Sequence, residues 1–262
     1  MSHSVDVATI DITMAEILRD GRRFADSPRP AVNGLRTQIG DGLFSIFGAV
    51  VAHEPVVVRA SSFRSDDVVS FTPYGRMRGA LLTQTLRLRM VQHVSHDPFG
   101  DAVTAWRASE GASELVDYFD AIDDDERARL ATDVAAHSVV LQQRIGDIPP
   151  QWRPRTAVRA RVRLANGQVE LRDHVDLAIG SISAGTGNAL IDFTSSLLDD
   201  NLERALRFHA LVESLRAGVA PRFVAALSTA TGDLWRVVVD DELLQRAITE
   251  LLDVVSQLKA AA

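Results

Sequence analysis

Two alternating runs joined by an Asn-Gly pair constrain the fold of this chain more than any other feature of its sequence. Thr156 to Leu164 alternates between apolar and polar residues, and Val169 to Gly180 does so again after Asn166-Gly167. A period of two predicts strands, and Asn-Gly between such runs predicts a two-residue hairpin. A Gly- and Ser-rich loop, SISAGTGN, then leads to a third expected strand, Ala189 to Thr194.

Helical patterns enclose these strands. Acids begin an expected helix from Asp125 to Arg144, and Asp199 or Asp200 can cap a second helix that ends before Gly218. The remaining expected elements are the strands Arg222 to Ser228 and Trp235 to Val239 and the helix Asp240 to Ala260. The order is α-β-β-β-α-β followed by one more strand and helix. It predicts an α/β fold with a mixed central sheet flanked by helices.

The first 120 residues predict a less regular α+β region. The expected elements are a helix from Thr13 to Ala25, strands from Pro55 to Ala60 and from Val68 to Phe71, and a helix from Met77 to Val94. The strongly acidic stretch from Asp117 to Glu126 marks a boundary. We therefore expect an N-terminal region of residues 1–120 and a second domain of residues 121–262.

Charge and composition limit the partners and the compartment. The chain has 28 basic and 35 acidic residues, and Lys259 is its single lysine. The net charge of −7 divides into −6 for residues 1–150 (15 against 21) and −1 for residues 151–262 (13 against 14). A nucleic-acid surface would have to be a local patch, whereas the acidic N-terminal half could bind a protein partner. No cysteine, signal pattern or bilayer-length apolar stretch occurs, so we expect a cytoplasmic protein that does not enter membranes.

Asp176 and Asp192 are predicted to lie opposite each other on the second and third strands. If the loop centres near Ala184, paired residue numbers sum to about 368, and a one-residue slip would bury both acids. The other face then becomes apolar through Val175, Leu177, Ile179, Ala189, Ile191 and Phe193. Directly opposed like charges destabilise a ladder, and Mg²⁺ often binds one or two carboxylates plus phosphate oxygens. The pair predicts a divalent-metal site; the alternatives are acids that face solvent or a register that differs by two.

Three short motifs follow one another in the second half of the chain. HVDLAIG lies on the second strand, ALIDFTSS on the third, and LRFHALVESLRAGVAPRFVAALS spans the next helix and strand. In order and spacing they resemble the RecB-type branch of the PD-(D/E)XK nucleases. The resemblance implies a restriction-endonuclease-like core, metal-dependent cleavage of DNA, and Mg²⁺ or Mn²⁺ held by Asp176 and Asp192 with help from His137. A helix histidine with an ordinary hydrogen-bond partner is the other interpretation of His137.

The chain departs from the family pattern at its most important cation. The motif lysine is replaced by Thr194, whose hydroxyl carries no charge. In some relatives the adjacent helix supplies the cation, which here points to Arg204 or Arg207. Arginine recognises phosphate but is a poor proton acceptor, so water activation would rest on the metal. His209 occupies the tyrosine position of the helix motif, and Asp173 occupies a position that usually holds glycine.

Arginines alternate along the first strand. Arg159, Arg161 and Arg163 share one face and predict contacts with a phosphate backbone. The alternative is a solvated strand edge that charge protects from aggregation. Together the features predict a nuclease-fold protein that binds nucleic acid, most naturally DNA, with a divalent metal. The competing hypotheses are a catalytically inactive member that serves as an interaction or scaffold subunit, and an unrelated α/β domain.

Overall fold

The computed structural model describes residues 13–14, 30–48, 54–63, 72–90, 96–110, 114–146, 148–180 and 189–261. Its centre is a mixed sheet of six strands: β1 (Val56–Val58), β2 (Arg155–Leu164), β3 (Val169–Ile179), β4 (Ala189–Thr194), β5 (Phe223–Ser228) and β6 (Leu234–Val238). The order is β1-β3-β4-β5-β6, and β2 lies against β3. The β1–β3 and β4–β5 pairs are parallel and the others antiparallel. The expected α/β fold with a mixed sheet is confirmed.

Strand β3 organises this sheet. One of its edges pairs with β2 along nearly its whole length. Its other edge pairs with β1 through residues 169–171 and with β4 through residues 177–179. Between these two short ladders, residues 172–176 of β3 have no strand partner on that side among the described residues. This opening lies beside helix α7.

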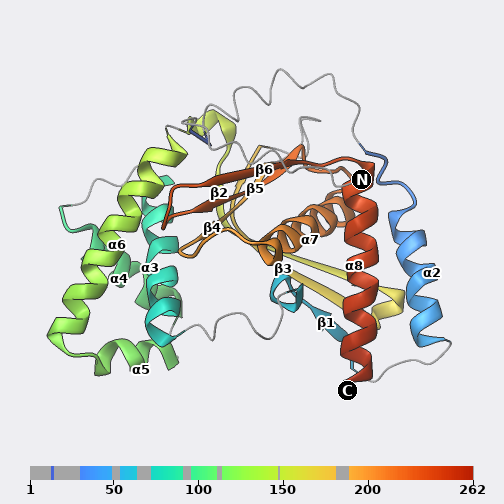
Figure 1. Cartoon of the computed structure of the whole chain (residues 1–262), viewed down its shortest axis with the longest axis horizontal. Helices are drawn as coiled ribbons and strands as arrows, with labels where there is room; N and C mark the ends of the chain where they lie inside the picture. The colour runs from blue at the N-terminus through green and yellow to red at the C-terminus, as the bar shows by residue number, and fades with distance from the viewer. Residues whose placement is uncertain are drawn as a thin grey trace.

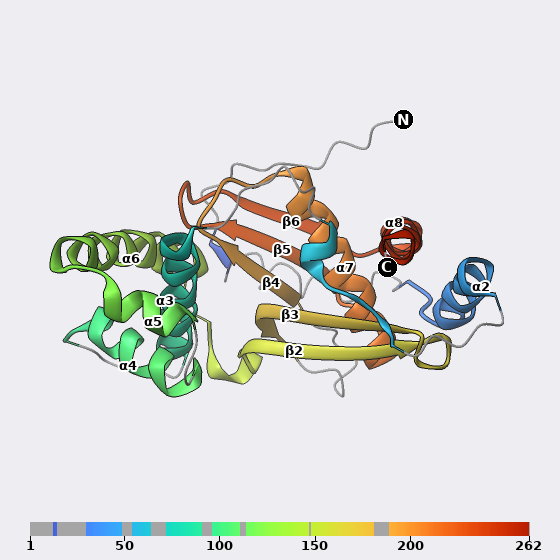
Figure 2. The same ribbon diagram turned by 90° about the horizontal axis from the view of Figure 1, so that it is seen from below.

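Helices lie on both faces of the sheet and at both of its ends (Figures 1 and 2). The elements are α2 (Leu35–Phe47), α3 (Pro73–Met90), α4 (Pro98–Glu110), α5 (Glu114–Ala121), α6 (Asp124–Ile145), α7 (Asp200–Ala217) and α8 (Asp241–Ala260). Helix α7 runs across the sheet, α2 and α8 lie side by side at one end, and α3 to α6 form a group at the other. Apolar residues of α2, α7 and α8 share one buried cluster with one face of the sheet. Residues of α3 and α6 pack on the other face.

Local sequence signals explain where the C-terminal helices begin and end. Asp199 accepts a hydrogen bond from the Leu202 N–H and so caps α7, as the sequence predicts. Gly218 follows α7 with a φ of 69°, a left-handed conformation that glycine adopts without strain. Asp240 caps α8 in the same way through the Leu243 N–H. The predicted order of elements after residue 121 is confirmed.

The Asn-Gly turn is longer than predicted. Leu164 pairs with Val169, so four residues, Ala165 to Gln168, join β2 and β3. Ala165, Asn166 and Gly167 all have positive φ. A third residue in the left-handed region lengthens the turn, and the two-residue hairpin was therefore wrong in length although right in position.

The N-terminal half differs more from its prediction. Strand β1 lies within the expected Pro55 to Ala60, and α3 begins at Pro73, before the expected Met77. Helices α2, α4 and α5 were not predicted. Most of the expected Thr13 to Ala25 helix and all of the Val68 to Phe71 strand lie outside the described residues.

The described parts of the two halves share their cores. Leu35, Ile39, Leu43 and Phe47 of α2 and Val58 of β1 are buried in the same cluster as α7 and α8. Helix α6 joins a separate helical core with α3 to α5, around Trp106 and Phe119. A division at residue 120 remains a prediction, and this packing crosses it in both directions. Among the described residues, no helix combines the length and apolar character needed to cross a bilayer.

Candidate metal and phosphate site

The β3–β4 register matches the predicted one. Leu177 pairs with Ile191, Ala178 with Leu190 and Ile179 with Ala189. The ladder stops there, so the next pair in register is Asp176 and Asp192. Here carboxylate oxygens replace backbone oxygens as hydrogen-bond acceptors between the strands. Asp192 Oδ1 accepts from the Asp176 N–H (3.3 Å), and Asp176 Oδ2 accepts from the Phe193 N–H (2.9 Å). The two carboxylates therefore lie in the opening between the strands.

Strand β3 changes phase at Asp176. Before it, Val169, Leu171 and Val175 pack in the cluster that includes α7; after it, Leu177 and Ile179 pack on the opposite face. The β2–β3 register would pair Ala157 with Asp176, but this described pair is missing from the ladder, and Ala157 has a φ of 50°. A non-glycine residue in that region stores strain, which is common beside functional groups. Of the predicted apolar face, Val175 alone lies on the other side for this reason.

A histidine from α7 bridges two aspartates. His209 Nδ1 lies 2.7 Å from Asp173 Oδ1, and its Nε2 lies 2.7 Å from Asp192 Oδ2. The side chains of His209 and Asp173 are 1% and 3% exposed, while that of Asp192 is 18% exposed. Burial alone would lower the pKa of His209, but the charges of Asp173 and Asp192 and their hydrogen bonds raise that pKa well above its usual value. The imidazolium is thus a built-in countercharge.

The two aspartates respond differently to that countercharge. Although burial opposes the shift, the charge and hydrogen bond of His209 hold the pKa of Asp192 below its usual value. Burial and the negative charge of Asp192 raise the pKa of Asp176 to about 7. Asp176 is therefore a carboxyl group without sufficient positive charge beside it.

These residues fit a magnesium-type ion. The donors are hard carboxylate oxygens, their mutual repulsion is incompletely neutralised, and Asp192 is partly open to solvent. In the described part of the chain, no group of three or more His, Asp or Glu side chains is arranged to hold a metal. Two carboxylates are nevertheless a common protein contribution to a Mg²⁺ site that phosphate and water complete.

The described hydrogen bond of His137 is to Thr229 rather than to either acid. Its Nδ1 lies 2.9 Å from the Thr229 hydroxyl oxygen. Burial and the charge of Arg78 lower the pKa of His137, and Asp133 is the acid that acts against them. The structure thus gives this histidine a hydrogen-bond partner on the turn after β5, and its metal-assisting role stays a prediction.

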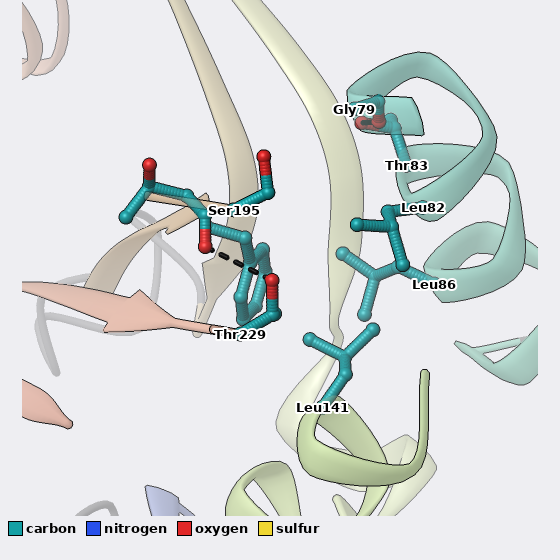
Figure 3. A pocket seen from close by; sticks show the side chains of 9 residues that line it. Gly79, Leu82, Thr83, Leu86, Leu141, Ser195 and Thr229 are labelled. Carbon is teal, nitrogen blue, oxygen red and sulfur yellow. Dashed lines mark hydrogen bonds between the residues drawn. The ribbon is translucent and has the colours of Figure 1, made fainter. Parts of the chain in front are cut away.

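Thr194, at the lysine position, adjoins a small apolar cavity (Figure 3). The cavity has a volume of about 30 Å³, and Leu82, Leu86 and Leu141 point into it from α3 and α6. That space holds about two waters. The Thr194 hydroxyl accepts from the Ser196 N–H (3.1 Å), and its backbone oxygen accepts from Thr229. The side chain at position 194 is thus neutral, and the cavity beside it is lined by the hydroxyl residues Thr83, Ser195 and Thr229 as well as by leucines.

The two arginines expected from α7 occupy different surroundings. Arg207 donates to Glu250 Oε1 (2.8 Å) and Oε2 (3.0 Å) on α8 and also pairs with Glu203. Its guanidinium thus joins α7 to α8 rather than the aspartates. Arg204 is exposed. The catalytic role expected of Arg207 and the nucleic-acid role of Arg204 stay predictions.

The arginines of β2 divide into two groups. Arg161 and Arg163, with Arg172 of β3, converge on Glu170, whose side chain is 1% exposed. Hydrogen bonds from Arg161 and Arg172 lower the pKa of Glu170 to about 2. Arg159 is exposed and has no carboxylate partner among the described residues.

Sequence reasoning missed three participants. Asp173 and His209 appeared only as departures from a motif, although a histidine and an aspartate amid apolar residues are a signal of a buried ion pair. Arg87 of α3 also acts on the site, because its charge opposes the rise in the pKa of Asp176. No local pattern connects position 87 with position 176, so tertiary packing alone reveals this pair.

Comparison with known proteins gives no family assignment. No family model and no curated protein matches the chain. A solved structure described as "Crystal structure of SSO0001" is similar over 85% of this chain and 84% of that chain, with 8% sequence identity and a TM-score of 0.33. A similarity of this size carries no argument about fold or function.

Proposed function

We propose that this chain binds nucleic acid together with a divalent cation, Mg²⁺ or Mn²⁺, at Asp176 and Asp192, and that it cleaves phosphodiester bonds there. The observation that carries the proposal is the meeting of the two carboxylates where the β3–β4 ladder opens. The raised pKa of Asp176, caused by burial and by Asp192, reflects negative charge that a cation would neutralise. DNA is the expected substrate.

Each residue of the site has a separate task in this proposal. Asp176 and Asp192 hold the ion, which when bound polarises phosphate and promotes the ionisation of water. His209, itself held by Asp173, fixes the orientation of Asp192. Thr194 contributes a neutral hydroxyl. Arg159, Arg161, Arg163 and Arg204 are the proposed contacts to the nucleic-acid backbone.

A second candidate function is a catalytically inactive nuclease-fold subunit that serves as a scaffold. One observation favours it: the imidazolium of His209 already supplies a positive charge to Asp192. The uncharged Thr194 at the lysine position agrees with this alternative. The acidic N-terminal half would then be the surface that binds a protein partner.

Thermal unfolding and cleavage together test the first function. The full chain would be heated with EDTA, Mg²⁺, Mn²⁺ or Ca²⁺ and incubated with labelled single- and double-stranded DNA and RNA. Asp176→Asn and Asp192→Asn are the test variants. Glu170→Gln, on the same strand, is the matched control for an acid outside the proposed site. We expect Mg²⁺ or Mn²⁺ to raise the Tm of the wild type and of the control.

The outcomes separate the two candidates. A metal-dependent Tm rise and cleavage that both disappear in Asp176→Asn support the enzyme. Loss of activity on the order of 10²-fold or more is expected for either aspartate, because each removes several kcal/mol of charge stabilisation. A Tm rise without cleavage supports the inactive subunit. The same Tm for the wild type with and without metal, and no cleavage, would refute a metal site at this pair.

A further inference from the structure

An open cleft lies between α3 and α4 on one side and the β2–β3 hairpin on the other. Its volume is about 740 Å³. Five of the residues that line it are arginines: Arg59, Arg87, Arg159, Arg161 and Arg172. Asp173 and His174 line it as well, so the cleft reaches the group that contains His209 and Asp192. This concentration of positive charge contrasts with a chain whose net charge is −7.

The five arginines are not equivalent. Arg161 and Arg172 are paired with Glu170, which neutralises part of their charge. Arg59, Arg87 and Arg159 have no carboxylate within 4.0 Å among the described residues, in contrast to Arg207 with its two. Guanidinium groups without an internal carboxylate are available to an external anion, and their planar fork matches two oxygens of a phosphate.

Arg87 is also held in place. Its Nη1 donates to Gln84 Oε1 (3.3 Å), and Gln84 Nε2 donates to the Ser109 hydroxyl (3.3 Å). Ser109 in turn donates to the backbone oxygen of Trp106 (2.9 Å). Gln84 is only 6% exposed. A buried amide that links α3 to α4 therefore fixes the guanidinium before any ligand arrives, which reduces the entropy lost on binding.

Arg87 lies close to the carboxylate pair. It lines the same cleft as Asp173 and His174, the β3 residues that come shortly before Asp176. Asp173 is joined through His209 to Asp192, so the cleft and the proposed metal site share one hydrogen-bonded group. Thr194 at the motif position carries no charge.

We propose that this cleft binds phosphate groups and that Arg87, from the N-terminal half, supplies the positive charge that the residue at position 194 does not. The proposal rests on the proposed function for its ligand class, a phosphate of a nucleic acid. Two of the three predicted strand contacts, Arg159 and Arg161, line the cleft from β2; Arg87 lines it from α3, and Arg59 lines it from the segment that follows β1. Residues 59–61 and the cleft-lining residues of α3 and α4 are then part of the binding site.

Binding without metal isolates this proposal from the chemistry. Fluorescence anisotropy with a labelled single strand and a labelled duplex would be measured in EDTA for the wild type, Arg87→Gln, Arg87→Lys and Arg159→Gln. Arg89→Gln is the matched control, because it removes the same charge two residues along α3 from a residue that does not line the cleft. Unlabelled inorganic phosphate and a nucleoside monophosphate would be used as competitors. These arms distinguish a strand from a small phosphate compound.

We expect Arg87→Gln to weaken oligonucleotide binding about tenfold and to reduce the salt dependence by about one counterion. Arg87→Lys should recover part of the affinity, and Arg159→Gln should weaken binding independently. Inorganic phosphate should displace the labelled oligonucleotide from the wild type and from Arg89→Gln at the same concentrations. That result would support phosphate as the recognised group. Equal affinity of Arg87→Gln and Arg89→Gln for every probe overturns the proposal.

The two proposals can fail separately. Arg87→Gln should retain the metal-dependent rise in Tm, which Asp176→Asn should lose. Arg87-dependent binding without any metal effect would refute the proposed function and leave the phosphate cleft standing. If Arg87→Gln keeps the metal effect, the cleavage and normal oligonucleotide binding, the phosphate cleft is refuted and the proposed function stands. If an active wild type is found, Arg87→Gln should lower kcat more than Arg89→Gln does.

Discussion

Two acids of strand β3, Glu170 near its start and Asp176 near its end, have pKa values shifted in opposite directions. At its start, Glu170 accepts from Arg161, Arg163 and Arg172, and its pKa falls to about 2 through the hydrogen bonds of Arg161 and Arg172. Near its end, burial and a second acid raise the pKa of Asp176 to about 7. Three arginines thus surround the single negative charge of Glu170, whereas the negative charge of Asp176 lies beside a second carboxylate.

This difference separates a structural acid from one that can respond to a ligand. Glu170 remains ionised and paired over the whole physiological pH range, so a bound cation would gain little from it. Asp176 and Asp192 share one imidazolium and an opening in the sheet. A group whose charge is incompletely balanced is where a cation changes the free energy most.

Replacing His209 should have the largest effect on stability of the substitutions considered for this comparison. His209→Gln keeps much of the volume but removes the cation between Asp173 and Asp192. We expect it to lower the free energy of unfolding by about 3–5 kcal/mol, the usual cost of leaving a buried charge unpaired. Urea denaturation would measure it, with His174→Asn, at an exposed position of β3, as a control expected to stay within about 0.5 kcal/mol. A loss no larger than that of the control would mean that His209 carries no buried charge.

The stability contributions of Glu170 and Asp176 should change with pH in opposite directions. Because the pKa of Glu170 is lowered to about 2, its contribution to stability is complete above pH 4.5 and disappears as the pH falls towards 2. The deficit of Glu170→Gln should therefore shrink only below pH 4.5. Because the pKa of Asp176 is raised to about 7, wild type should lose stability relative to Asp176→Asn as the pH rises from 3.8 to 7.

Urea unfolding in EDTA between pH 2 and 8 would measure both slopes, with the wild type and the two variants in the same buffers. The comparison would be refuted if Asp176→Asn showed the same pH dependence as Glu170→Gln. A flat difference between wild type and Asp176→Asn would mean that Asp176 is ionised throughout.

Arg207→Gln should have a smaller and purely structural effect. It removes the two hydrogen bonds to Glu250 and the contact with Glu203. We expect a loss of about 1–2 kcal/mol in the free energy of unfolding and an unchanged metal-dependent rise in Tm. Arg204→Gln, one helix turn away in an exposed position, should change neither quantity. Loss of the metal effect in Arg207→Gln would favour the catalytic role that the sequence predicts.

Ala157 should give the smallest effect. Glycine removes the strain of a φ of 50° but loses more backbone entropy on folding, so Ala157→Gly should change stability by less than about 1 kcal/mol. Ala157→Val should destabilise by more, because a β-branched residue tolerates this conformation worst. Chemical denaturation of both variants would measure the difference. Equal stability of the two variants would show that the backbone opposite Asp176 relaxes to an ordinary strand conformation.

Some of these features could be predicted from the sequence because they depend on residues close together along the chain. The pairing of Leu177 with Ile191 follows from alternation around one loop, and Asp199 and Gly218 mark the ends of α7 by local geometry. The predicted opposition of Asp176 and Asp192 belongs to this class.

The rest depends on long-range packing. His209 reaches Asp173 across 36 residues, and Arg87 reaches the cleft from a helix that precedes β3 by about 80 residues. Alternation could not predict the phase change at Asp176, which lies across the β2–β3 ladder from the backbone distortion at Ala157. Helix α2 packs on α8, and its Gln38 contacts Gln245 across 207 residues of sequence, so no local pattern reveals this contact.

The packing of α2 on α8 also has a consequence during synthesis. Ala31 donates to Asp241, Gln245 donates to Gln38, and Lys259 lies over the ring of Phe47. Ribosomes add about 5–20 residues each second, so roughly 10–40 s pass between the emergence of α2 and that of α8. The apolar side chains Leu35, Ile39 and Leu43 wait through that interval without their final neighbours. On the nascent chain, the apolar side of α2 therefore stays accessible to chaperones until α8 has been synthesised.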